Sequence, residues 1–278
     1  MGSYLRPVHL DDALAALGAG PRTPLAGGTD VYPARVGRPI DDDILDLTGL
    51  PDLREITVAD GLCRIPALAT WSDLLRHDLP ARFDGLKAAA RSVGGVQIQN
   101  RGTICGNLCN ASPAADGLPN LVALGADVEL TSRSGRRVVA ADDFVVGNRR
   151  TLRRPDELVT GLLIATPDRE GRSVFLKLGA RAYLVISIAM VAAVVEVGTD
   201  GRIVAARIVV GACSEVPTRL VALEARLIGR IPSGGLGGDV QPADLDALSP
   251  IDDVRAPAAY RREAALVLVR RAVDELTS

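Results

Sequence analysis

The most informative residues of this chain lie in two glycine-rich stretches, Leu25-Ala26-Gly27-Gly28-Thr29-Asp30 and NRGTICGNLCNASPAAD at residues 100–116. Each offers bare backbone, small hydroxyls and side-chain amides, which let a polyanion approach the main chain closely. Neither ends in the Gly-Lys-Ser/Thr of a P-loop, and neither is the G-x-G-x-x-G turn of a dinucleotide-binding βαβ unit. A chain that binds a dinucleotide through these stretches must therefore use another fold.

The first stretch has the chemistry of a diphosphate site. Gly27 and Gly28 remove side chains and permit positive φ, Thr29 adds a hydroxyl, and the N–H groups can converge as a nest or a helix N-terminus. Hydrogen bonds to a charged group contribute about 1.5–3 kcal/mol each. Asp30 has the wrong charge to contact phosphate directly, so we assign it to capping or to orienting the loop.

The second stretch is similar in character, because Gly102, Thr103, Gly106, Asn107 and Ala111 are all small or carry an amide. Asp116, at its end, can accept hydrogen bonds from a ribityl or ribose hydroxyl. A simpler interpretation, that both stretches are only tight turns, stays open at this point.

Composition excludes several classes of protein. The chain has 278 residues, 47% of them hydrophobic, and a net charge of −2, so nothing points to nucleic acid or an anionic membrane as a partner. Its four cysteines and two histidines do not have zinc or iron–sulfur spacing, so we expect no metal site. Without a signal segment or an apolar run long enough to span a membrane, we expect a cytoplasmic protein with free thiols.

Runs of strands with helices set apart from them indicate the α+β class. The apolar patterns predict strands at residues 23–26, 43–47, 53–58, 62–67, 157–165 and 173–180, and hairpins at 127–140 and 185–211. They predict helices at 9–18, 80–93, 118–124, 218–228 and 257–274. We expect the second glycine-rich stretch to be a loop throughout, and a domain boundary near residues 167–172.

The motifs resemble those of the FAD-binding medium subunit of the molybdenum hydroxylases, the family of xanthine dehydrogenase and carbon monoxide dehydrogenase. That family commonly reads A-G-G-T-D or A-G-G-H-S in its first loop and Q-I-R-N-x-x-T-I-G-G-N in its second. This chain has AGGTD at 26–30 and QIQNRGTICGN at 97–107. The resemblance extends to residues 157–159 (ELV), to 175–177 (FLK) and to the overall length. Cys105 stands where glycine is usual, so we expect either an altered turn, a thiol near the flavin, or simply a tolerated small residue.

The resemblance implies a two-subdomain FAD-binding fold of the PCMH/VAO type followed by a C-terminal α+β domain with an antiparallel sheet and helices. It places the FAD-binding domain at 1–168, with subdomains at about 1–55 and 56–168, and the C-terminal domain at 169–278. FAD is expected to be non-covalent, because no histidine flanks the first glycine-rich stretch. The flavin is the reacting group, so no side chain is assigned as catalytic.

By position in the family motifs, the resemblance assigns the diphosphate side to residues 25–31 and 103–107, and the ribityl or ribose region to Asp116. It places Val159 against the isoalloxazine or adenine region and Lys177 near the flavin ring, where a cation would tune the redox potential. The full set implied for cofactor binding is Leu25, Ala26, Gly27, Gly28, Thr29, Asp30, Val31, Gly102, Thr103, Gly106, Asn107, Ala111, Asp116, Val159 and Lys177.

The resemblance also implies partners. Electrons would come from a molybdopterin large subunit through the [2Fe-2S] clusters of an iron–sulfur small subunit, and would leave the FAD for NAD+ or another acceptor. Two alternatives stay open: a stand-alone FAD-dependent oxidoreductase, and a non-catalytic nucleotide-binding or scaffold subunit that has lost FAD. The substrate of such a complex is not indicated.

Overall fold

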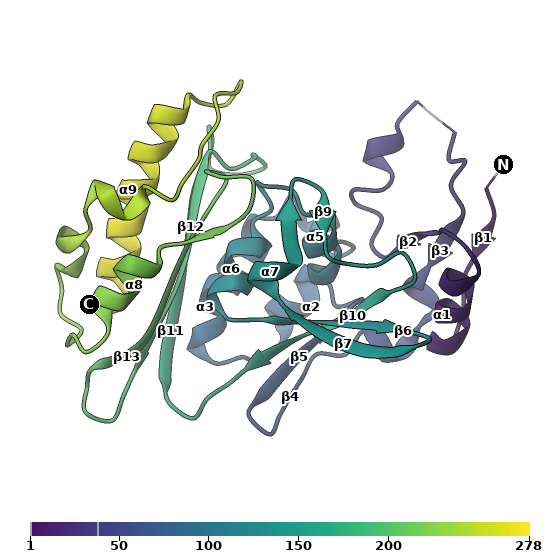
Figure 1. Ribbon diagram of the computed structural model, residues 1–278, viewed down its shortest axis with the longest axis horizontal. Coiled ribbons are helices and arrows are strands. Elements are labelled where there is room, and N and C mark those ends of the chain that lie inside the picture. Colours follow the sequence, from purple (N-terminus) through teal and green to yellow (C-terminus); the bar gives the residue numbers. More distant parts are fainter. Residues whose placement is uncertain (1, 38) are drawn as a thin grey trace.

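The computed structural model describes residues 2–37 and 39–278, and their fold is α+β, as predicted (Figure 1). The N-terminal part is a small parallel sheet in the order β1-β3-β2, covered by α1. The bounds are β1 Tyr4–Leu5, α1 Leu10–Ala19, β2 Thr23–Leu25 and β3 Ile44–Asp46. Ala13, Leu14 and Leu17 form the buried face of α1, which packs into a core shared with the short helical turns after β3.

A five-stranded antiparallel sheet forms the middle of the molecule, in the order β4-β5-β10-β6-β7. Its strands are β4 Thr57–Ala59, β5 Leu62–Pro66, β6 Asp127–Ser132, β7 Gly135–Ala140 and β10 Leu158–Ala165. The helices of this part are α2 Trp71–Arg76, α3 Asp84–Ser92, α4 Val96–Gln99, α5 Ile104–Asn110, α6 Gly117–Ala123 and α7 Ala141–Phe144. A small hairpin, β8 Val145–Gly147 with β9 Arg150–Thr151, leads back to β10.

The C-terminal part is a four-stranded antiparallel sheet in chain order with two main helices. Its elements are β11 Glu170–Leu178, β12 Ala189–Val197, β13 Ile203–Gly211, β14 Thr218–Arg219, α8 Val221–Leu227 and α9 Ala258–Thr277. Short 3₁₀ turns complete the chain at Pro33–Arg35, Leu47–Gly49, Pro51–Leu53, Ala81–Phe83, Leu236–Asp239 and Pro242–Leu245.

Both faces of β12 are covered, which explains its unbroken apolar sequence. Val191, Ala193 and Val195 lie in the core beneath α8 and α9, while Met190, Ala192 and Val194 alternate with them and join the core of the middle part. α3 and α6 therefore pack against the opposite face of the sheet from α9 (Figure 1). The division of the chain into domains at residue 168 stays a prediction.

Three predicted elements are wrong in part. The second glycine-rich stretch is not a loop throughout, because it follows directly on α4 and contains all of α5. The predicted strand at 53–58 begins only at Thr57, after a 3₁₀ turn that starts at Pro51. Residues 218–219 form β14 before α8 begins, since they pair with Val209 and Val210 at the sheet edge.

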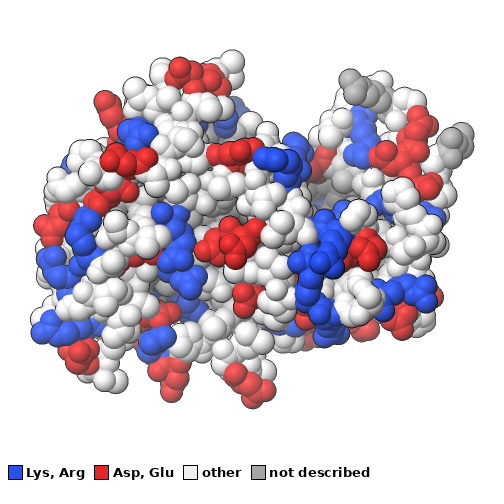
Figure 2. Space-filling view, in the orientation of Figure 1, with Lys and Arg blue, Asp and Glu red and all other residues white. Residues whose placement is uncertain are grey.

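Charge is mixed over the surface drawn in Figure 2, where Lys and Arg alternate with Asp and Glu and neither sign dominates. In the part of the chain that the structure describes, no helix combines the length and the apolarity needed to cross a bilayer.

Candidate functional site

A cavity of about 440 Å³ lies between the N-terminal sheet on one side and α5 with β10 on the other. This volume is typical of a small-molecule site. Predicted residues that line it are Ala26, Gly27, Gly28, Thr29, Asp30, Val31, Gly102, Thr103, Gly106, Asn107 and Val159. Cys105, within the predicted range 103–107, lines it too. Lining residues that the sequence did not single out for binding are Pro24, Leu47, Ala67, Trp71, Val93, Ile98, Cys109, Asn110, Arg153 and Leu158.

The two glycine-rich stretches meet in direct backbone contact. A Cβ atom on Gly27 would lie 1.9 Å from the carbonyl oxygen of Arg101, a distance that no real contact allows. A Cβ atom on Gly102 would lie 3.3 Å from Thr29 Oγ1. Glycine at position 27 is therefore a condition for bringing the two stretches together, a packing reason that adds to the one from ligand approach.

Thr103 fixes the start of α5 at the cavity wall. Its Oγ1 accepts a hydrogen bond from the Gly106 N–H at 3.0 Å, which is the usual geometry of an N-cap. The backbone of Gly102 is held from the other side, because its carbonyl oxygen accepts from the Trp71 N–H at 3.2 Å. The small residues of the motif thus lie at the first turn of a helix that is tied down on both sides.

Asn107 carries the clearest sign of a missing partner. Its Oδ1 is buried and has no hydrogen-bond partner among the described residues, and Asn107 lines the cavity. Leaving a buried acceptor unsatisfied costs about 1–3 kcal/mol. A ligand with hydroxyl or N–H donors, such as the ribityl chain of a flavin, fits this place.

Four predicted residues lie outside the cavity lining. Leu25 is in the core at the end of β2, and Ala111 ends α5 in the left-handed region with φ 46°. Asp116 is buried and accepts from Lys177 Nζ at 2.6 Å and from Ser187 Oγ at 2.7 Å. In this structure the Asp116–Lys177 pair therefore joins the middle part of the chain to β11, and a role for either side chain toward the cofactor stays a prediction.

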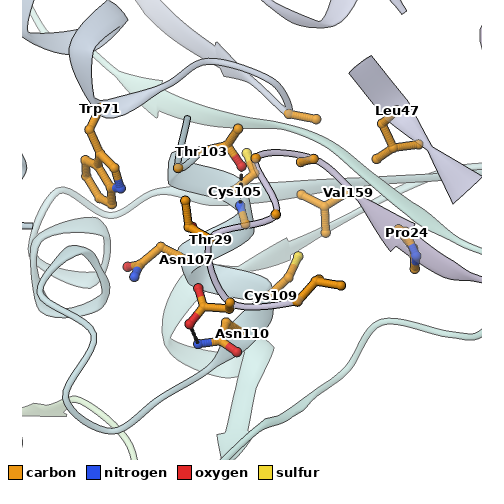
Figure 3. Close-up of a pocket in the computed structure, with 18 of the residues that line it drawn as sticks. Pro24, Thr29, Leu47, Trp71, Thr103, Cys105, Asn107, Cys109, Asn110 and Val159 are labelled. Carbon is orange, nitrogen blue, oxygen red and sulfur yellow. Dashed lines mark hydrogen bonds between the residues drawn. The ribbon is translucent and has the colours of Figure 1, made fainter. Parts of the chain in front are cut away.

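Asp30 is engaged by a chain of hydrogen bonds that the sequence did not indicate. Asn110 Nδ2 donates to Asp30 Oδ1 at 3.1 Å (Figure 3), and Arg149 Nη1 donates to Asn110 Oδ1 at 2.6 Å. The backbone N–H of Arg149 also donates to Ala111 at 2.9 Å. This Asp30–Asn110–Arg149 chain connects the first glycine-rich stretch to the end of α5 and to the β8–β9 hairpin.

The expectation of an altered turn at Cys105 is wrong. Cys105 lies in the first turn of α5, and the positive φ falls at Ala111 instead. Burial raises the pKa of the Cys105 thiol well above its ordinary value and that of Cys109 to about 11. Both thiols are therefore protonated at neutral pH and are poor nucleophiles.

Comparison with known proteins assigns a family to this architecture. The family model described as the FAD binding domain in molybdopterin dehydrogenase matches residues 1–167. The chain belongs to this family. A second model, the CO dehydrogenase flavoprotein C-terminal domain, matches residues 175–276, so the two models together cover almost the whole flavoprotein.

Relatives that match this chain over almost its whole length are named as subunits of dehydrogenases. The chain is 32% identical to the glyceraldehyde dehydrogenase medium chain of Sulfolobus acidocaldarius, over 99% of this chain and 98% of that one. It is 34% identical to the carbon monoxide dehydrogenase medium chain of Afipia carboxidovorans, over 98% and 95%. A chain of the crystal structure of Cu,Mo-CO dehydrogenase in its cyanide-inactivated form matches with a TM-score of 0.90, 30% identity and coverage of 99% and 97%.

Proposed function

We propose that this flavoprotein is the electron-transfer subunit of a multi-subunit molybdenum hydroxylase and that it holds FAD in the cavity described above. The observation that carries the proposal is the meeting of the two glycine-rich stretches at one cavity wall, where Gly27 abuts Arg101. The unpartnered Oδ1 of Asn107 in the same cavity adds a second, independent reason to expect a ligand there.

The residues present fit the cofactor. The backbone N–H groups of residues 27–29 and the first turn of α5 would hold the diphosphate, and Asn107 Oδ1 would accept a hydroxyl of the ribityl chain. When bound, FAD would supply transfer of one or two electrons between an electron donor and an acceptor outside this chain. Attachment is proposed to be non-covalent, since the described lining contains no histidine and Cys109 is held as the thiol.

The partners are proposed from the names of relatives such as the two medium chains described above. We infer an iron–sulfur small subunit with [2Fe-2S] clusters and a molybdopterin large subunit, with NAD+ or another acceptor as the final oxidant. Substrate choice would then lie on the large subunit. A cytoplasmic location is proposed because all four cysteines, Cys63, Cys105, Cys109 and Cys213, are free thiols.

The visible spectrum of the purified chain tests the proposal. We expect flavin bands, with FAD released into the supernatant after heat denaturation. A colourless protein that also fails to take up added FAD would contradict the flavin assignment, and chromophore that stays with the precipitate would contradict non-covalent binding. Anaerobic addition of NADH then asks whether NAD+ is the acceptor, since bleaching of the flavin bands requires hydride exchange with the nicotinamide.

A matched pair of variants ties the result to the cavity. Gly27→Ala places a methyl group on the Arg101 carbonyl oxygen and should abolish FAD uptake. Gly234→Ala is the control, because a Cβ atom there meets nothing within 4 Å. Equal FAD uptake by the two variants would mean that the glycine-rich stretches do not form the cofactor site.

A further inference from the structure

The cavity has two unlike ends. Figure 3 shows Trp71 on one side of the view and Leu47 and Pro24 on the opposite side, with the labelled α5 residues between them. Ile98, from the α4 segment, lines the cavity and remains 38% exposed, whereas Leu47, Leu158 and Val159 are 2–6% exposed. The part of the wall at Ile98 therefore reaches the surface and is called the open end here, whereas the part formed by Leu47, Leu158 and Val159 is closed and apolar and is called the closed end.

A single basic side chain, that of Arg153, lines the described part of the cavity, and it lies beside the closed end. Its Nη1 donates to the Glu157 carbonyl oxygen at 2.8 Å, directly before the lining residues Leu158 and Val159, and to the Arg154 carbonyl oxygen at 3.1 Å. Its Nε and Nη2 make no hydrogen bond to any residue that the structure describes. One edge of the guanidinium is thus fixed and the other remains available.

Arg153 is close to α5 as well. Its charge acts on the Cys109 thiol, where it opposes part of the rise in pKa that burial causes. Cys109 lies in the last turn of α5 and lines the same cavity. The guanidinium therefore lies between the β9–β10 connection and the end of α5 away from the Thr103 cap.

The carboxylate in the lining does not neutralise Arg153. Asp30 accepts its hydrogen bond from Asn110, which in turn accepts from Arg149. Asp30, the one carboxylate in the described lining, is therefore connected through Asn110 to Arg149 and not to Arg153. A diphosphate held by the backbone N–H groups of residues 27–29 and the first turn of α5 still carries negative charge beside mostly apolar walls, and Arg153 is the described lining residue that supplies a cation, on the adenosine side.

We propose that Arg153 binds the adenosine monophosphate half of FAD at the closed end of the cavity. The inference rests on the proposed function and extends it to the selection of FAD over shorter flavins. An electron-transferring ring must reach a partner, which favours the open end for the flavin and the closed, apolar end for the adenine. The planar guanidinium of arginine suits this place, since it stacks on an aromatic face and pairs with phosphate.

Flavin binding by the apo chain tests the proposal. Dissociation constants for FAD, FMN and riboflavin are measured by flavin fluorescence for the wild type, Arg153→Met, Arg153→Lys and Arg154→Met, with AMP as competitor. We expect Arg153→Met to raise the dissociation constant of FAD by about ten- to a hundredfold and to leave that of riboflavin unchanged. Arg153→Lys should recover part of the loss, and AMP should compete in the wild type but not in Arg153→Met.

Arg154→Met is the matched control, because Arg154 has the same charge, is adjacent in the chain and is exposed. Unchanged FAD binding in Arg153→Met would overturn the inference, and so would an equal weakening of FAD and riboflavin. Thermal melts of the apo variants separate binding from folding. A wild-type chain that binds no flavin would instead contradict the proposed function itself.

Discussion

Cys105 occupies the place where the family motif has glycine, and its surroundings explain why a thiol is accepted there. The side chain is 2% exposed, belongs to the central core, and its Sγ lies 3.8 Å from the Ile65 carbonyl oxygen. It has right-handed helical backbone, so glycine brings no conformational advantage. The cysteine acts as a small apolar residue that fills space between α5 and β5.

Cys105→Gly should therefore destabilise the chain, although it restores the usual motif. We expect the free energy of unfolding of the apo chain to fall by about 1 kcal/mol or slightly more, from added backbone freedom and lost burial. Urea denaturation measures this, with Cys105→Ala as the milder comparison. A Cys105→Gly variant as stable as the wild type would show that the thiol does not contribute to packing.

Residues of the site differ in how far the sequence reveals them. Gly27, Thr29 and Thr103 belong to continuous motifs whose small size and polarity are visible locally. Arg149 and Arg153 have no such pattern, because they come from a hairpin and a connection that only the tertiary fold brings to the cavity. Leu47 ends a strand that the sequence predicts, at 43–47, but only the structure shows that this strand runs parallel to the one that precedes the first glycine-rich stretch.

At the scale of elements, α5 shows why the sequence of the second glycine-rich stretch predicts a loop where the structure has a helix. Its glycines and small residues have low helix propensity, which dominates the local pattern. Yet Ile104 and Leu108 are four residues apart and both buried, and Thr103 provides the cap. Tertiary burial of one face stabilises this short helix against its composition.

The turn between β9 and β10 is organised by Glu157, which is 3% exposed. Arg137 donates to both of its carboxylate oxygens, at 2.6 and 2.8 Å, and the Arg154 N–H donates at 2.8 Å. The hydrogen bonds from Arg137 hold the pKa of Glu157 below its ordinary value. The same turn places Arg153, whose Nη1 donates to the Glu157 carbonyl oxygen.

Glu157→Gln should therefore have a pH-dependent effect on stability. The lowered pKa means that the ionised carboxylate stabilises the fold fully above its ordinary pKa near 4.5, and that this contribution is lost as the pH falls through the lowered value. We expect a loss of about 1–3 kcal/mol at pH 7 that shrinks under acidic conditions. Urea titrations at pH 7 and below pH 4 give the free energies of unfolding of the wild type and Glu157→Gln. A difference between the two proteins that is the same at both pH values would contradict the lowered pKa of Glu157.

At the scale of the whole molecule, a buried ion pair joins the middle part to the C-terminal sheet. Asp116 begins the α6 segment, Lys177 lies on β11, and Ser187 precedes β12. Asp116 is also reached by Ser92 Oγ at 3.2 Å, so four side chains meet at one point. The pair is enclosed on both sides, with side-chain exposures of 15% for Lys177 and 7% for Asp116.

Lys177→Met should be destabilising, because it leaves the Asp116 carboxylate buried without its cation, at a cost of about 3 kcal/mol. Adding Asp116→Asn to the same chain should recover part of the loss. Lys87→Met provides a control on the other lysine of the sequence, which lies on α3. Chemical denaturation measures the free energy of unfolding of each variant. An equal loss in Lys177→Met and Lys87→Met would contradict a stabilising role for the Asp116–Lys177 pair.

The order of the parts along the chain was predictable, and their packing was not. The unbroken apolar run of β12 indicates a strand covered on both faces, and the glycine turn at Gly201 indicates its hairpin with β13. Nothing in the sequence says which helices provide the second cover. In the structure this cover is α3 and α6, which begin about 105 and about 72 positions before β12.

The cavity walls come from positions far apart along the chain: Pro24 to Leu47 on one side and Ala67 to Val159 on the other. During synthesis the first wall is therefore made well before β10, and the nascent protein holds half a site until β10 has been added. A cofactor seated between the two walls can be captured only after that point, by a chain whose C-terminal part is still being made or by the released polypeptide.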